Sequence, residues 1–216
     1  MVTSTPKTAL VLGATGLIGD LLTHRLVDSP FYSNVKVLVR KSLNWQHPRL
    51  QEVQFDFDHP NGLVTQADDI FCCLGTTIKK AGSKEAFRKV DYQYPLDIAR
   101  LGLTNGSQQF AIVTAMGADA GSSIFYNRVK GEVERDLTSL KYPTLLVFRP
   151  SLLLGNRSEN RLGERIASGV MRLFNPVIPD KYKGIDAEKV ANAMLTTMQQ
   201  GLEGKHVFES DTLQKY

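Results

Sequence analysis

Short apolar runs alternate with longer stretches of mixed polarity along most of the chain. The first apolar run, residues 9–12, ends at Gly13, and residues 17–27 then repeat apolar positions with a helical period. Runs of this length predict buried strands, and a helical period predicts helices that pack along one face. The pattern predicts strands at 9–12, 35–39, 53–55, 69–74, 110–113, 144–148 and 206–208, and helices at 17–27, 83–101, 125–140, 162–174 and 186–200.

The alternation of strands and helices predicts an α/β fold, a single doubly wound parallel sheet of the Rossmann type with right-handed crossovers. The run at 110–113 is apolar at every position, as expected of a strand that helices cover on both faces. The length favours one domain over residues 1–216, in which residues 151–183 form a small substrate-side lobe.

Single residues mark several boundaries of these elements. Ser83 and Asp186 are expected to begin helices, because their side chains can accept a hydrogen bond from the first turn. Pro95 is expected to bend the helix at 83–101. Residues 175–183 are predicted to form a proline-rich loop.

Glycines follow the first predicted strand at regular spacing. Residues 8–19 read TALVLGATGLIG, with Gly13, Gly16 and Gly19 three positions apart. Between a strand and a helix, such glycines permit a tight turn, close approach of the main chain to a pyrophosphate, and close helix–strand packing. The helix N-terminus adds free N–H groups and the positive end of its dipole. The stretch therefore predicts a dinucleotide site, with a purely structural turn as the alternative.

Tyr126 and Lys130 lie four residues apart near the start of the helix predicted at 125–140, which places both side chains on one face. A nearby ammonium favours the ionised phenol, so Tyr126 can act as an acid or a base. Thr114 ends the preceding strand, at the edge of the sheet where cofactor chemistry takes place. Two surface residues of a helix are the ordinary meaning of this spacing, but its place after a nucleotide turn favours catalysis.

Arg40 and Lys41 follow the second strand, where an NAD site usually offers a carboxylate to the ribose hydroxyls. A guanidinium suits a 2′-phosphate through its charge and its fork of donors. The pair therefore predicts NADP(H) in preference to NAD(H), with two solvated cations at a strand end as the alternative.

Composition changes this picture little. The formal net charge of +4 comes from scattered basic residues, so nucleic acid is not expected as a partner. No apolar run reaches the length of a membrane span, and the first one lacks the basic leader of a signal peptide. Cys72 and Cys73 are adjacent, and the four histidines show no ligand spacing. Neither a disulfide nor a metal site is expected, and a cytoplasmic location is predicted.

Five motifs together resemble the atypical short-chain dehydrogenase/reductases, in the branch of the Tat-interacting oxidoreductase. The resemblance covers residues 8–195 and is specific because all five occur together. The motifs are Gly13-Ala14-Thr15-Gly16-Leu17-Ile18-Gly19, Cys73-Leu74-Gly75-Thr76-Thr77, Met116-Gly117-Ala118-Asp119, Tyr126-x-x-x-Lys130-Gly131-Glu132 and Phe148-Arg149-Pro150-Ser151-Leu152-Leu153-Leu154-Gly155.

The resemblance implies a role for each part of the site. Tyr126 would be the general acid/base, and Lys130 would hydrogen-bond the nicotinamide ribose. The serine of the family falls at Thr114, or one residue on at Ala115, which has no hydroxyl. Asp56 would accept from the adenine amino group. The expected cofactor-binding residues are Gly13, Thr15, Gly16, Leu17, Ile18, Gly19, Arg40, Lys41, Asp56, Phe57, Leu74, Gly75, Thr76, Thr77, Tyr126, Lys130, Pro150 and Leu152.

The function expected from these residues is an NADP(H)-dependent oxidoreductase that transfers hydride to or from a small carbonyl or alcohol substrate. A homodimer is compatible with this expectation. Because Thr114 or Ala115 replaces the usual serine, an NADPH-binding regulatory or sensor protein with little turnover is the first alternative. A sugar-nucleotide epimerase or dehydratase is less expected, since such relatives carry a larger C-terminal region than residues 151–183 provide.

Overall fold

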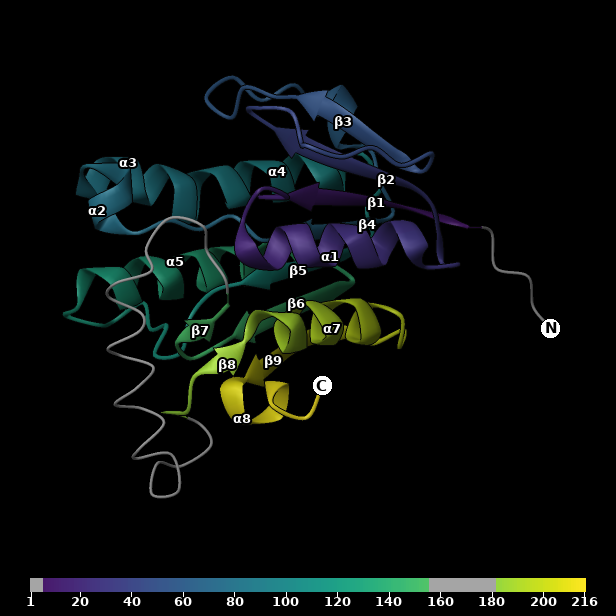
Figure 1. Cartoon of the computed structure of the whole chain (residues 1–216). Helices are drawn as coiled ribbons and strands as arrows, with labels where there is room; N and C mark the ends of the chain where they lie inside the picture. The colour runs from purple at the N-terminus through teal and green to yellow at the C-terminus, as the bar shows by residue number, and fades with distance from the viewer. Residues whose placement is uncertain (1–5, 156–181) are drawn as a thin grey trace.

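A parallel sheet of seven strands forms the centre of the computed structural model, which describes residues 6–155 and 182–216 (Figure 1). The order β3-β2-β1-β4-β5-β6-β9 makes β3 and β9 the edge strands. Every neighbouring pair is parallel, so the α/β, Rossmann-type prediction is confirmed. The strands are β1 (Lys7–Leu12), β2 (Tyr32–Val39), β3 (Leu50–Gln54), β4 (Asp69–Cys72), β5 (Gln109–Val113), β6 (Thr144–Arg149) and β9 (Gly204–Glu209).

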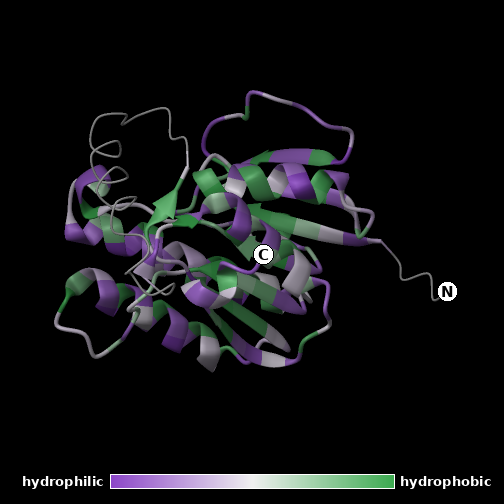
Figure 2. Cartoon of the chain, turned by 60° about the horizontal axis from the view of Figure 1, so that its bottom comes forward, coloured by the Kyte–Doolittle hydropathy of each residue, from purple (hydrophilic) through white to green (hydrophobic). Residues whose placement is uncertain are grey.

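Helices cover both faces of the sheet. One apolar cluster joins α1 (Leu17–Asp28) and α7 (Ala187–Met198) to the sheet, and a second joins α4 (Tyr94–Thr104) and α5 (Phe125–Ser139) to the other face. In Figure 2 the central strands are largely green, the colour of apolar residues, whereas the helices alternate between green and purple along their length. The shorter elements are η1 (Gly62–Thr65), α2 (Ile78–Ala81), α3 (Lys84–Arg88), η2 (Lys89–Gln93), β7 (Leu153–Leu154), β8 (Ile185–Asp186) and α8 (Ser210–Leu213).

The helix predicted at 83–101 is one helical run with a change of pitch. Ser83 begins it as predicted, and its hydroxyl accepts from the Ala86 amide at 3.1 Å. The chain then passes from α3 through η2, a π-helical turn, into α4. Pro95 is the second residue of α4, directly after η2, and because proline has no N–H it interrupts the regular helical hydrogen-bond pattern at this point of the run.

Other boundaries differ by a few residues from the pattern. The strand predicted at 206–208 extends over Gly204–Glu209, and Asp186 caps α7 through the Glu188 amide at 3.0 Å, as predicted. The pairing of β7 with β8 was not predicted, because two residues are too few to show a period. The helix at 162–174 lies outside the described residues, as does most of the loop at 175–183 and most of the lobe at 151–183.

Candidate functional site

Two glycines in the turn that joins β1 to α1 have no room for a side chain. Gly13 has a φ of +80°, and a Cβ there would lie 2.7 Å from the Cys73 carbonyl oxygen. A Cβ on Gly19 would lie 2.1 Å from the Gly13 oxygen, so Gly19 permits the close packing of α1. Gly16 has an ordinary φ of −86° and is exposed. Thus Gly13 and Gly19 are required by the fold, whereas Gly16 leaves an open main-chain surface.

The start of α1 is suited to an anion. Gly16 is its N-cap, and no side chain caps the first turn, so the first amides of the helix are free of a side-chain acceptor. Thr15 is exposed and Leu17 is half-buried beside them, whereas Ile18 faces the core. The uncapped N–H groups and the exposed Gly16 fit a pyrophosphate, which such groups bind through hydrogen bonds and the helix dipole.

The turn after β4 lies against the proposed acid/base pair. A Cβ on Gly75 would be 3.9 Å from the Lys130 ammonium, so Leu74-Gly75-Thr76-Thr77 passes directly over Lys130. Thr77 is exposed, and its hydroxyl caps α2 by accepting from the Lys80 amide at 3.1 Å. The structure therefore brings the first turn of the sheet, the 74–77 turn and α5 to the same edge.

Tyr126 and Lys130 lie one turn apart on α5, as predicted. The Tyr126 ring is half-buried against Phe87, with 5.5 Å between ring centroids. Lys130 is 4% exposed, and its ammonium lies 2.7 Å from the Asp91 carboxylate. Burial lowers the pKa of Lys130, but the nearby Asp91 and Tyr126 more than offset this and hold it above the ordinary value. Lys130 is therefore a cation at neutral pH.

Thr114 faces a buried network behind α5. Its hydroxyl donates to the Glu134 carboxylate at 2.6 Å, and Arg149 donates to the same carboxylate from Nε at 3.0 Å. Arg149 also bonds Glu209 at 2.9 Å, which ties the ends of β5, β6 and β9 together. A hydroxyl has one proton to donate, so Thr114 in this arrangement offers none to a substrate oxygen. The neighbouring Ala115 is half-exposed.

Replacement of Thr114 by valine is expected to reduce the free energy of unfolding by about 1–3 kcal/mol, because a buried carboxylate loses a donor. Denaturant unfolding of Thr114→Val measures this loss. Thr114→Ser keeps the hydroxyl and serves as the control. An unchanged stability of the valine variant would show that Glu134 does not need this hydroxyl, which could then donate to a substrate oxygen instead.

The expected 2′-phosphate residues, Arg40 and Lys41, are exposed at the carboxyl end of β2. Asp56 is also exposed, but its two oxygens accept from the Asp58 amide and contact His59, both at 2.9 Å. The His59 contact lowers the pKa of Asp56. Adenine recognition by Asp56 would have to replace these local bonds.

The expected cofactor-binding residues Phe57, Pro150 and Leu152 differ in which of their atoms are accessible to a ligand. Phe57 is buried, and its ring packs on Phe55 with 4.9 Å between centroids, so only its main chain can meet a ligand. Pro150 is buried at the end of β6, and its carbonyl accepts from the Met116 amide at 3.0 Å. Leu152, two residues on, is exposed.

Three charged residues at this edge were not among the predicted ones: Asp91, Glu134 and Arg149. Arg149 is part of the motif at 148–155, and Glu134 follows the motif that ends at Glu132, but nothing in the sequence indicates that the two form an ion pair. Asp91 stood within a predicted helix with no motif around it. The sequence offered one signal for Asp91 and Glu134. Each is a charged residue at a helix position where the apolar period predicts a residue that faces the core.

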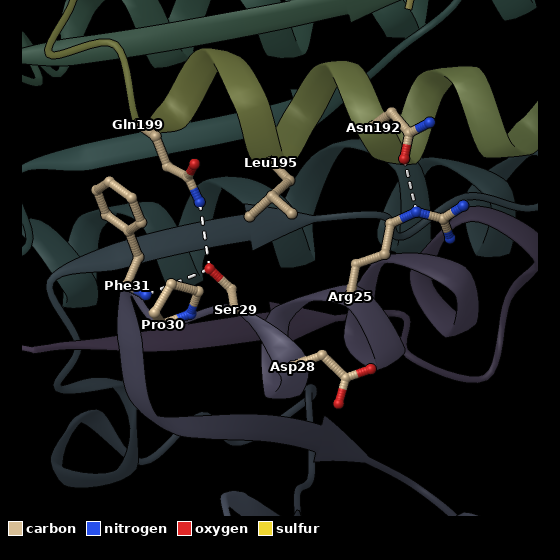
Figure 3. Close-up of a pocket in the computed structure, with 8 residues that line it drawn as sticks. All are labelled: Arg25, Asp28, Ser29, Pro30, Phe31, Asn192, Leu195 and Gln199. Atoms are coloured by element: carbon tan, nitrogen blue, oxygen red, sulfur yellow. Dashed lines mark hydrogen bonds between the residues drawn. The ribbon is translucent and has the colours of Figure 1, made fainter.

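A pocket of about 450 Å³ lies away from this site, between the end of α1 and α7 (Figure 3). Arg25 donates to Asn192 at 2.6 Å across it, and Gln199 donates to Ser29 at 3.3 Å. Because α1 has 12 residues, its end lies about 18 Å from the glycine turn. The pocket is therefore separate from the candidate cofactor site.

Solved structures share this fold at low sequence identity. The chain superposes on "MoeE5 in complex with UDP-glucose and NAD" with a TM-score of 0.72 and 15% identity, covering 93% of this chain and 75% of that one. It superposes on the PhqB reductase domain from Penicillium fellutanum with a TM-score of 0.69 and 16% identity, covering 94% and 67%. The fold is therefore that of the NAD-binding Rossmann proteins.

Sequence comparison then gives the family. The HIM1 family model matches residues 36–177. Protein HTATIP2 of Rattus norvegicus is 35% identical over 201 residues, which cover 89% of this chain and 81% of the relative. The mitochondrial protein FMP52 of Candida albicans is 30% identical over 204 residues, covering 90% and 89%. The chain belongs to the HIM1 family, and the resemblance to the branch of the Tat-interacting oxidoreductase is confirmed.

The same comparison corrects the predicted location. Several relatives, among them those of Candida albicans and Scheffersomyces stipitis, are named as mitochondrial proteins, so the cytoplasmic prediction is wrong. That prediction rested on the unpaired Cys72 and Cys73, which indicate a reducing environment but do not distinguish one reducing compartment from another. Within the described ranges, no helix is long and apolar enough to cross a membrane.

Proposed function

We propose that the protein is an NADP(H)-dependent oxidoreductase that transfers hydride to or from a small carbonyl or alcohol substrate. The observation that carries the proposal is the placement of Tyr126 and the buried Lys130 one turn apart on α5, with Lys130 directly beneath the 74–77 turn. An uncapped helix N-terminus after a glycine turn lies at the same edge. The proposed acid/base, the proposed donor to the ribose and the proposed phosphate site thus lie at one edge of the sheet.

Each residue has a defined task in this proposal. A bound nicotinamide cofactor supplies or accepts the hydride. Tyr126 gives the substrate oxygen its proton during reduction, or takes it during oxidation. Lys130 has three N–H donors, so it can serve a ribose hydroxyl while it stays paired with Asp91 at 2.7 Å. The main chain at Gly16 and the first amides of α1 hold the pyrophosphate.

The proposed preference for NADP(H) over NAD(H) depends on Arg40. Arg40→Asp is expected to weaken NADPH binding about tenfold to a hundredfold, because it removes a charge-assisted contact worth about 1.5–3 kcal/mol and adds a repulsion. The affinity for NADH should change much less. Calorimetric titration of both cofactors measures the two affinities.

The control for this substitution is Arg100→Asp, an exposed arginine on α4 that pairs only weakly with Asp97, at 3.7 Å. It makes the same change of charge and should leave both affinities within about twofold. Equal affinities of the unmodified protein for NADPH and NADH would contradict the preference for NADP(H).

A second candidate function is an NADPH-binding sensor with little turnover. The observation in its favour is the Thr114 hydroxyl, which bonds Glu134, next to Ala115, which has no hydroxyl. The oxidation of NADPH with a panel of aldehydes, ketones and quinones distinguishes the two functions. Tight NADPH binding without oxidation by any member of the panel would favour the sensor.

A mitochondrial location is proposed from the relatives that carry this word in their names. Immunodetection of the untagged protein in purified mitochondria and in the remaining cell fractions tests this proposal.

A further inference from the structure

We propose that Asp91 is a positioning residue, which holds the Lys130 ammonium in place and ties it to the 74–77 turn. The assignment rests on the proposed function, since it concerns how Lys130 meets the cofactor. Asp91 lies on η2, an element that contributes none of the expected site residues.

The geometry of Asp91 joins two parts of the site. One carboxylate oxygen lies 2.7 Å from Lys130 Nζ, and the other accepts from the Thr76 amide at 3.0 Å. Asp91 is 1% exposed and Lys130 is 4% exposed, so the pair is largely shielded from solvent. A Cβ on Gly75 would lie 3.7 Å from the same carboxylate. One buried carboxylate thus fixes both the ammonium and the turn above it.

The π-helical turn accounts for this placement. The amide of Tyr94 bonds the carbonyl of Lys89, five residues back, which widens the helix by one residue. The neighbouring tyrosines turn away from the site, since Tyr92 bonds Asp136 at 2.7 Å and Tyr94 bonds Asp58 at 3.0 Å. Asp91, the residue before Tyr92, has its carboxylate on the other side of the helix, where it meets Lys130 and the Thr76 amide.

The chemistry of a buried pair explains why the carboxylate matters. A solvent-excluded ammonium without a counter-charge is strongly disfavoured, and it either moves toward water or gives up its proton. Either change removes the donor from the place where a ribose hydroxyl would meet it. Within the described part of the chain, the other groups found to act on Lys130 are the Tyr126 phenol and the Cys72 thiol, and neither is a permanent anion as a carboxylate is.

The test is a double-mutant cycle on NADPH affinity, which requires no turnover. Asp91→Asn is expected to weaken NADPH binding about tenfold to a hundredfold, the range expected for a lost charge-assisted hydrogen bond. In the background of Lys130→Met, the same substitution should change the affinity less than about twofold, because the group it positions is absent. With any substrate that the unmodified protein reduces, the KM for NADPH should rise while kcat at saturation changes less than about threefold.

Asp69→Asn is the matched control. Asp69 is also 1% exposed and pairs with a lysine, Lys7, at 3.0 Å, but at the opposite end of β4. This variant should lose stability and keep its NADPH affinity within about twofold. If Asp91→Asn also kept its affinity, or lost as much in the Lys130→Met background as alone, the assignment would be overturned. If the unmodified protein did not bind NADPH, the proposed function would fail, and this assignment with it.

Discussion

Replacing Tyr126 with phenylalanine is expected to lower the turnover of a carbonyl substrate by about 10²–10⁴-fold, the usual contribution of a general acid or base. The substitution keeps the ring and its packing on Phe87, and it removes the only proton that the side chain can transfer. NADPH affinity should barely change, because Lys130 and the glycine turn still hold the cofactor. Steady-state kinetics together with calorimetric titration measure both quantities.

Tyr92→Phe is the matched control for this experiment. Tyr92 is likewise half-buried, but its hydroxyl donates to Asp136, away from the glycine turn and Lys130. Turnover by the control should stay within about threefold of the unmodified protein. Full activity of Tyr126→Phe would show that the phenol is not the proton carrier, and the sensor would then be the better description of the protein.

A second large effect is expected at the glycine turn, where Gly16→Val should weaken NADPH binding by more than about a hundredfold. A valine there stands where the pyrophosphate must approach the main chain, and it would cost more than one charge-assisted hydrogen bond, each worth about 1.5–3 kcal/mol. Stability should fall much less, because Gly16 has an ordinary φ of −86° and is exposed. Thermal unfolding with and without NADPH separates the two effects.

Gly62→Val is a suitable control, since a Cβ at Gly62 and one at Gly16 each meet their nearest atom at 3.2 Å. Gly62 lies in η1, outside the turn, so its variant should keep the stabilisation by NADPH. Gly13 is a poor choice for the test, because any side chain there is strained at a φ of +80° and collides with the main chain of Cys73. If NADPH raised the unfolding temperature of Gly16→Val as much as that of the unmodified protein, the turn from Gly13 to Gly19 would have a structural role only.

The sheet could be predicted from the sequence because its strands are short apolar runs between amphipathic stretches. Residues 110–113 and 144–148 were identified by their nearly unbroken apolar runs, and the structure buries every residue in both ranges. The change of pitch at η2 was not predictable in the same way. A single π-helical turn shifts the apolar period by one residue, a shift that the surrounding helical period of α3 and α4 conceals.

The site was predictable as far as its parts lie close in the sequence. Tyr126 and Lys130 share one helix, and Gly13 to Gly19 form one turn, so spacing alone placed them together. The contacts of Lys130 with Asp91, and of Thr114 with Glu134, depend instead on how α5 packs against η2 and β5. Sequence spacing contains no information about such packing, which is why Thr114 was expected to face a substrate.

The position of β9 at the edge of the sheet affects how the chain folds as it is synthesised. β6 pairs with β5 on one side and with β9 on the other, and β9 is synthesised well after β6. Until β9 emerges from the ribosome, one edge of the apolar strand Thr144–Arg149 has no hydrogen-bonding partner. An open, apolar edge of this kind readily pairs with other chains. Nascent chains that stall before residue 204 should therefore depend on chaperones more than the finished protein does.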